Sequence, residues 1–219
     1  MVMSVPTLSA LEVRVIAVLF EKQHTTPDVY PLTLNALASG CNQKTSRSPV
    51  MEVSEADVQS ALESLKGFAL VIESYGASGR VLRYAHNLPK VLNIGQAASA
   101  LLVTLMLRGA QTAAEIRANA DRLYSFADPS SVEAYLEELA NRKDGALVMR
   151  LPRQPGTREA RWCHVWAGEP KLEPISSTAP QDPSDSNALT AEVAALREDV
   201  DALRKLIEHL YGELGLSKP

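Results

Sequence analysis

A pattern of helices and strands that occurs twice in the first 168 residues constrains the fold of this chain more than any other feature. Its clearest mark is a triplet of apolar residues at helical spacing, which recurs 74 positions later. The two triplets are Val58, Leu62 and Leu65, and Val132, Leu136 and Leu139. An internal repeat of about 75 residues predicts two small domains, at residues 1–90 and 91–168.

The first copy predicts three helices followed by a hairpin. Apolar residues recur at helical spacing after Ser9, which with Glu12 forms a capping box. The apolar period later changes from that of a helix to that of a strand, on either side of a glycine-rich turn. The expected helices cover residues 9–23, 31–39 and 54–67, and the expected strands cover residues 68–74 and 80–86.

The second copy repeats this order. Residues 94–107 are expected as a helix, a second capping box is formed by Thr112 and Glu115, and a further helix opens at Pro129. Residues 146–151 and 160–166 then predict a second hairpin. Three helices and a hairpin form a winged helix, a helix-turn-helix fold. The predicted fold class is therefore mainly α with small β-hairpins (α+β), as two tandem winged helix domains.

A different pattern occupies the C-terminal part of the chain. Residues 169–187 are rich in proline and polar residues, which predicts a flexible linker. Residues 188–216 carry heptads that predict a coiled-coil helix and a homodimer. The apolar heptad positions are Leu189, Val193, Leu196, Val200, Leu203, Ile207, Leu210 and Leu214. The alternative is a single amphipathic helix that folds back onto its own domains.

The charge of the chain is unevenly distributed. The formal net charge is −4, but residues 169–219 alone hold five basic and ten acidic residues, a net charge of −5. The two predicted domains together carry +1. The composition is not that of a generally basic nucleic-acid-binding protein, so any contact with DNA must depend on local patches.

The sequence contains no recognisable catalytic or cofactor-binding motif. Cys41 and Cys163 lie far apart, which excludes a disulfide scaffold and fits a reducing cytoplasm. Cys163 and His164 have no further ligand at a metal-site spacing, and the other histidines are isolated. No apolar run approaches the roughly 20 residues of a membrane-spanning helix. We therefore expect a cytoplasmic protein that is not an enzyme, with no metal, no cofactor and no membrane partner.

Basic residues gather at the predicted wings and in one loop, whereas the third helix of each copy is acidic. The acidic residues are Glu55 and Glu63 in the first copy and Glu133, Glu137 and Glu138 in the second. The candidate phosphate-binding residues are Lys44, Arg47, Arg80, Arg83, Arg150, Arg153, Arg158 and Arg161. The loop at residues 41–48 is long for a helix connection. Its polar groups either bind phosphates and base edges, or form hydrogen bonds with one another and cap nearby helix ends.

Several strings of residues resemble one bacterial protein family. These strings are Thr25 to Leu32 (TTPDVYPL), Cys41 to Thr45 (CNQKT), Pro49 to Met51 (PVM), Leu107 to Thr112 (LRGAQT) and Pro155 to Glu159 (PGTRE). In this order they resemble the YceH-like family of uncharacterised bacterial proteins, over roughly residues 7–168. The resemblance implies a tandem winged helix fold. It implies no established activity, cofactor or ligand, and the heptad region looks like an addition to the family's motifs.

Two functions of different class remain open at the level of sequence. The first is a dimeric DNA-binding, regulatory protein that contacts phosphates through its wings and the loop at residues 41–48. The alternative is a protein–protein interaction scaffold that presents its acidic helical faces to a partner.

Overall fold

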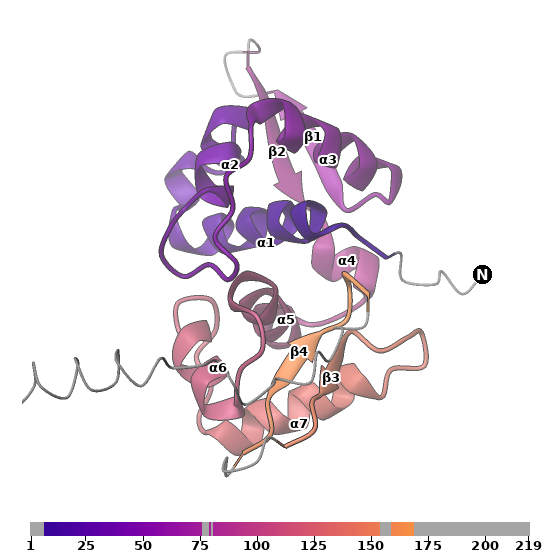
Figure 1. The fold of residues 1–219 in the computed structure, drawn as a ribbon. Coiled ribbons are helices and arrows are strands. Elements are labelled where there is room, and N and C mark those ends of the chain that lie inside the picture. The colour runs from indigo at the N-terminus through magenta and orange to yellow at the C-terminus, as the bar shows by residue number, and fades with distance from the viewer. Residues whose placement is uncertain (1–6, 76–78, 80, 154–158, 169–219) are drawn as a thin grey trace, which may run out of the picture. The chain divides into compact units, whose positions relative to one another are not determined.

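The structure of the protein is a computed structural model that describes residues 7–75, 79, 81–153 and 159–168. These residues belong to one compact unit (Figure 1). The predicted linker at residues 169–187 and the predicted coiled coil at residues 188–216 lie outside the described residues, as do Arg80 and Arg158.

The first copy has the predicted order of three helices and a hairpin. The helices are α1 (Ala10–Thr25), α2 (Leu34–Cys41) and α3 (Glu55–Gly67), with a short 3₁₀ turn, η1 (Pro27–Val29), between α1 and α2. Strands β1 (Val71–Tyr75) and β2 (Leu82–His86) pair antiparallel, with Val71 opposite His86.

The second copy has the same order. It contains α5 (Gln96–Arg108), α6 (Ala113–Ala120) and α7 (Pro129–Ala140), followed by the antiparallel pair β3 (Val148–Arg150) and β4 (Trp162–His164). A short helix, α4 (Leu88–Leu92), joins the two copies. The described chain is therefore mainly helical with two small strand pairs, as the sequence predicts.

Local signals placed most helix starts correctly. Ser9 and Thr112 form the predicted capping boxes with Glu12 and Glu115, because each hydroxyl accepts a hydrogen bond from an otherwise free N–H of the first turn. Gly109 takes a positive φ of 76° directly after α5, at the predicted end of that helix.

Two local predictions were wrong. The second helix does not begin at Pro31, because the backbone of Leu32 bonds to Tyr84 of β2 at 3.1 Å and 2.7 Å. The helix α2 begins only at Leu34, capped by Thr33. The second error is the omission of α4, whose five residues are too few to show a helical period.

The repeated triplets form equivalent parts of the core. Val58, Leu62 and Leu65 are buried on α3, and their counterparts Val132, Leu136 and Leu139 are buried on α7. Each triplet occupies one face of its helix, and the acidic residues of both helices are exposed.

The first helix of each copy lies in the interior. Residues 13–20 of α1 and residues 97–107 of α5 are buried without interruption. Buried residues of both copies form one continuous hydrophobic cluster, and α1 packs against α5 as well as against its own copy. A helix that is buried on all sides belongs to the centre of a core. The two copies therefore share a core.

Candidate functional site

The eight basic residues predicted to contact phosphates fall into three groups. Lys44, Arg150 and Arg153 are exposed. The guanidinium groups of Arg47, Arg83 and Arg161 bond within the protein. The remaining two residues, Arg80 and Arg158, lie outside the described part of the chain.

Arg47 is a buried structural residue in this conformation. Its side chain has no exposed surface and forms an ion pair with Glu21, with 2.5 Å between Nη2 and Oε2. The second terminal nitrogen donates to Oε1 of Glu21 at 3.1 Å, and Nε donates to the carbonyl of Gly40 at 3.3 Å. These bonds use the guanidinium N–H donors that would otherwise bind a phosphate.

Residues 42–53, which join α2 to α3, are held by bonds to the protein's own groups. The buried Arg14 of α1 donates to the carbonyls of Cys41 at 3.3 Å and Pro49 at 2.7 Å. The amide of Asn42 both donates to and accepts from the backbone of Val53, at 2.8 Å in each case. Of the two interpretations of this loop, the geometry favours the one in which its polar groups satisfy one another.

The same loop also contacts the second copy. The Ser48 backbone N–H donates to the carbonyl of Leu107 at 2.8 Å, and Arg108 donates to the Ser46 hydroxyl at 2.7 Å. Figure 1 shows the loop extending from the end of α2 down to the level of α5. The loop therefore fastens the two copies together. Sequence reasoning missed both arginines, because Arg14 lies in no recognised string and the string Leu107 to Thr112 gives no role to Arg108.

Arg83 and Arg161 likewise support the backbone. Arg83 donates to the carbonyl of Pro31 at 2.7 Å. Arg161 donates to the carbonyl of Ala110 at 2.7 Å and to Glu115 at 2.9 Å. Both arginines tie a hairpin to the segment beside it.

The second hairpin, formed by β3 and β4, retains exposed positive charge. Arg150 lies 3.9 Å from Glu137 of α7, and its guanidinium carbon lies 5.8 Å from the centre of the Trp162 ring. Half of each charged side chain in that ion pair remains exposed, so the pair contributes little stability. Arg153 is exposed beyond the end of β3.

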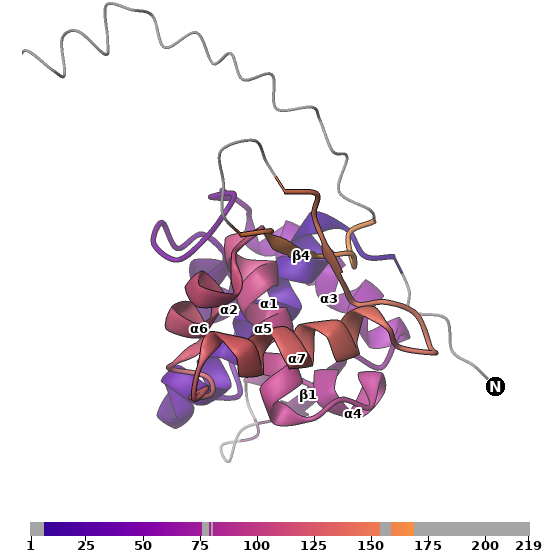
Figure 2. The same cartoon turned by 90° about the horizontal axis from the view of Figure 1, so that it is seen from below.

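Helix α7 has an acidic face. Glu133, Glu137 and Glu138 are all exposed on it. Figure 2, seen from below, shows α7 crossing the outer side of the second copy. On α3, by contrast, Glu55 accepts a hydrogen bond from Asn35 at 2.9 Å, and Asp57 caps its own helix.

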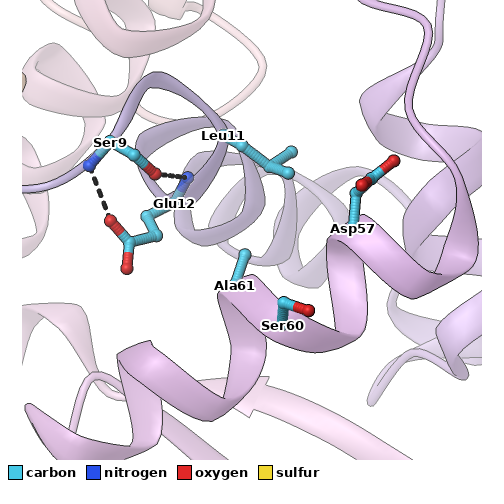
Figure 3. Close-up of a pocket in the computed structure, with 6 residues that line it drawn as sticks. All are labelled: Ser9, Leu11, Glu12, Asp57, Ser60 and Ala61. Atoms are coloured by element: carbon cyan, nitrogen blue, oxygen red, sulfur yellow. Dashed lines mark hydrogen bonds between the residues drawn. The ribbon is translucent and has the colours of Figure 1, made fainter.

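An open pocket of about 340 Å³ lies between the start of α1 and α3 (Figure 3). It contains two carboxylates, Glu12 and Asp57. Each caps a helix, and the hydroxyl and backbone N–H of Ser54 hold the pKa of Asp57 below its usual value. Figure 3 shows Glu12 bonded to Ser9 at the pocket's edge. A general acid near neutral pH needs a raised carboxyl pKa, whereas the pKa of both carboxyls is lowered by their hydrogen bonds.

A smaller cavity of about 100 Å³ lies between the two copies, and we name it the seam cavity. Its walls come from α1, the loop at residues 42–53, α5, α6 and the turn after α6. Its polar lining consists of Glu21, Thr25, Ser46, Thr104, Arg108, Asn119 and Arg122.

Both cysteines are buried free thiols. Burial raises the pKa of Cys41 to about 12 and that of Cys163 to about 11, so both are protonated near neutral pH. Within the described residues, no three His, Cys, Asp or Glu side chains are grouped as metal ligands. None of the described helices has the length and apolar character needed to cross a membrane.

These features define a mainly helical protein with two fused copies of a three-helix and hairpin unit. Residues 8–157 match the family described as protein of unknown function DUF480, and the chain belongs to this family. The expected membership of an uncharacterised bacterial family is thereby confirmed.

Relatives align along almost the whole chain. A UPF0502 protein of Paraburkholderia phymatum is 54% identical over 96% of this chain and 90% of its own length. UPF0502 proteins of Burkholderia thailandensis and Dechloromonas aromatica are 51% and 53% identical, over 97% and 93% of this chain and 92% and 96% of their own lengths. The family model ends at residue 157, but these alignments extend into residues 169–219. The C-terminal segment is thus shared at least in part with these relatives.

Proposed function

We propose that this protein is a non-enzymatic interaction module, in which two fused winged helix units present the acidic face of α7 to a basic segment of a partner protein. The observation that carries the proposal is the exposure of Glu133, Glu137 and Glu138 on one face of that helix. In a winged helix that reads DNA, the third helix enters the major groove. Three carboxylates at that position repel phosphates and attract cations.

The energetics of the helix support a basic partner. Glu133 and Glu137 are four residues apart, a spacing at which like charges destabilise a helix by about 0.2–0.5 kcal/mol. Among the described residues, the cation paired with this face is Arg150, which lies 3.9 Å from Glu137. Lysine or arginine residues of a partner remove this repulsion, and charges at the rim of an interface raise the association rate.

Charge reversal on α7 tests the proposal. Full-length protein carrying Glu133→Lys and Glu137→Lys is compared with a control carrying Asp28→Lys and Glu52→Lys, which changes the net charge equally at exposed sites on the first copy. Partners retained from a bacterial lysate are identified by mass spectrometry, and binding of each purified partner is then measured. We expect a basic partner whose binding is lost only in the α7 variant. Equal binding by both variants contradicts the proposal.

DNA binding is the second candidate, because Lys44 and Arg153 remain exposed. Its test is the affinity for duplex DNA as a function of salt. Phosphate contacts make the logarithm of the affinity fall linearly with the logarithm of salt concentration, and each lost contact lowers the slope by about 0.9. If DNA binds, the substitution Arg153→Ala reduces this slope. An affinity that does not depend on salt excludes this candidate.

The proposed assembly is a homodimer formed through the heptads at residues 188–216. Glu192 would face Arg197 of the partner subunit, and Asp199 would face Arg204 of the partner subunit, so both predicted interhelical pairs attract. Sedimentation equilibrium on the full chain and on a chain ending at residue 187 tests this assembly. We expect a dimer mass for the first and a monomer mass for the second, and a monomeric full chain contradicts the proposal.

A further inference from the structure

The seam cavity has the charge and donors of an anion site. Glu21 is the only carboxylate among the described residues that line it. Both of its oxygens accept hydrogen bonds from the guanidinium of Arg47, at 3.1 Å and 2.5 Å, so its charge is already balanced. Arg108 and Arg122 add two positive charges to the same walls. The cavity thus carries an excess of positive charge.

Arg108 is held in place with much of its donor capacity unused. Its guanidinium has five N–H donors, and within the described chain one of its nitrogens bonds, to the Ser46 hydroxyl at 2.7 Å. Burial lowers the pKa of Arg108, Glu21 opposes this effect, and the charge of Arg47 adds to it. A cation that is partly removed from water and lies near another cation is stabilised by an anion.

The size of the cavity limits the ligand. Its volume of about 100 Å³ is below the roughly 300–1,000 Å³ of sites for drug-sized molecules. Such a space suits a single small charged group. Guanidinium groups match the oxygens of phosphates and carboxylates in geometry. The Ser46 and Thr25 hydroxyls and the Asn119 amide lie along the same walls.

We propose that the seam cavity binds a small oxyanion, either free phosphate or the phosphate or carboxylate group of a small metabolite, between Arg108 and Arg122. The ligand contacts both copies, because Ser46 belongs to the first and both arginines belong to the second. This site is separate from the proposed interaction face on α7 and does not depend on it.

Calorimetric titration of the full-length protein with sodium phosphate, at an ionic strength held constant with sodium chloride, tests the site. Arg122→Gln and Arg108→Gln remove cations from the cavity. Lys143→Gln is the matched control, since Lys143 is exposed and does not line the cavity. Arg108 also bonds the loop at residues 42–53, so Arg122→Gln provides the test if the Arg108 variant fails to fold. Parallel titrations with methyl phosphate and acetate distinguish the chemical source of the ligand.

We expect saturable binding of phosphate that weakens about tenfold or more in each arginine variant, the effect of one lost hydrogen bond to a charged group. Lys143→Gln should bind like the unaltered protein. Tighter binding of methyl phosphate identifies a phosphate ester, and tighter binding of acetate identifies a carboxylate. The absence of binding by all three anions overturns the proposal. It is also overturned if Arg122→Gln binds as the control does, or if the control loses binding equally.

Discussion

Glu21 of α1 holds Arg47, and through it the loop at residues 42–53. Besides the bidentate pair with Arg47, it lies 4.0 Å from the ammonium group of Lys22. Only 16% of its side chain is exposed. A buried ion pair of this kind adds little net stability, but removal of one partner leaves the other charge buried and uncompensated.

Glu21→Gln is expected to destabilise the protein by about 3 kcal/mol, because the Arg47 guanidinium stays buried without its counterion. Arg47→Met removes the other charge, and the double variant is expected to lose less stability than the sum of the two single variants. Urea unfolding of the four proteins measures the coupling. Glu52→Gln, at an exposed site, is the control and should change stability by less than about 0.5 kcal/mol. Additive losses at Glu21 and Arg47 contradict the interpretation.

His86 is held in its neutral form by its surroundings. Its Nδ1 lies 3.4 Å from the N–H of Leu88, and its Nε2 lies 2.6 Å from Oε1 of Gln23, an arrangement that fits a neutral ring protonated on Nε2. Burial, with a smaller contribution from the charge of His24, lowers the pKa of His86 to about 4. Burial alone lowers that of His164 to about 4.

Stability should therefore be fully retained above pH 6.5 and should fall as the pH is lowered from 6.5 towards 4. In that interval the unfolded chain binds a proton on each histidine before the folded chain does. Each histidine contributes a slope of up to about 1.4 kcal/mol per pH unit. His86→Gln should reduce the slope of the unfolding free energy against pH and leave the contribution of His164. An unchanged slope would show that His86 is protonated as readily in the folded state as in the unfolded one.

At the scale of elements, the approach of α2 to α1 depends on a glycine. A Cβ atom placed on Gly40 would lie 2.7 Å from Cγ1 of the fully buried Val18. This distance is shorter than a normal contact between carbon atoms. The close approach also brings the Gly40 carbonyl within reach of Arg47.

Gly40→Ala is expected to cost about 1–3 kcal/mol through overpacking against Val18. Combination with Val18→Ala creates the missing space, so the double variant should be more stable than the sum of the single losses predicts. Chemical denaturation of both single variants and the double variant measures this compensation. Gly67→Ala is the control, since nothing lies within 4 Å of a Cβ atom there. No compensation between Gly40 and Val18 would mean that the methyl group is accommodated by a shift of the helices.

Most elements were predictable from local patterns, and the exceptions have a common cause. The starts of α1, α3 and α7 follow from capping residues within three positions. The start of α2 was wrong because the backbone of Leu32 is paired with Tyr84, more than fifty residues away. Helical periodicity contains no information about such a partner. The same limit applies to Arg47, whose loop shows no sign of the buried Glu21 on α1.

At the scale of the whole molecule, the two copies share one hydrophobic core. The buried faces of α1 and α5 are in contact, and the loop at residues 42–53 bonds to the end of α5. Either copy alone would expose much of its central helix to water, at a cost of about 25 cal/mol per Å² of apolar surface.

Residues 1–168 are therefore expected to unfold in one cooperative transition. Fragments of residues 1–93 and 94–168 should each lack stable tertiary structure, because each loses the apolar surface that covers its first helix. Calorimetry on the longer chain, with near-ultraviolet circular dichroism on the fragments, tests the expectation. Two separate transitions, or two fragments that fold independently, would contradict a shared core.

Local sequence is enough to predict the repeated order of helices and strands, the capping residues, and the apolar triplets of α3 and α7. All of these depend on residues close together in the chain. Which charged groups are buried and paired within the protein, and which face solvent, depends on the tertiary structure. It paired Arg47 with Glu21, left the acidic face of α7 exposed, and brought Arg108 and Arg122 to the seam cavity. The physical reason is that the charge of a residue is a property of its type, whereas its burial and its partner depend on segments far away in sequence.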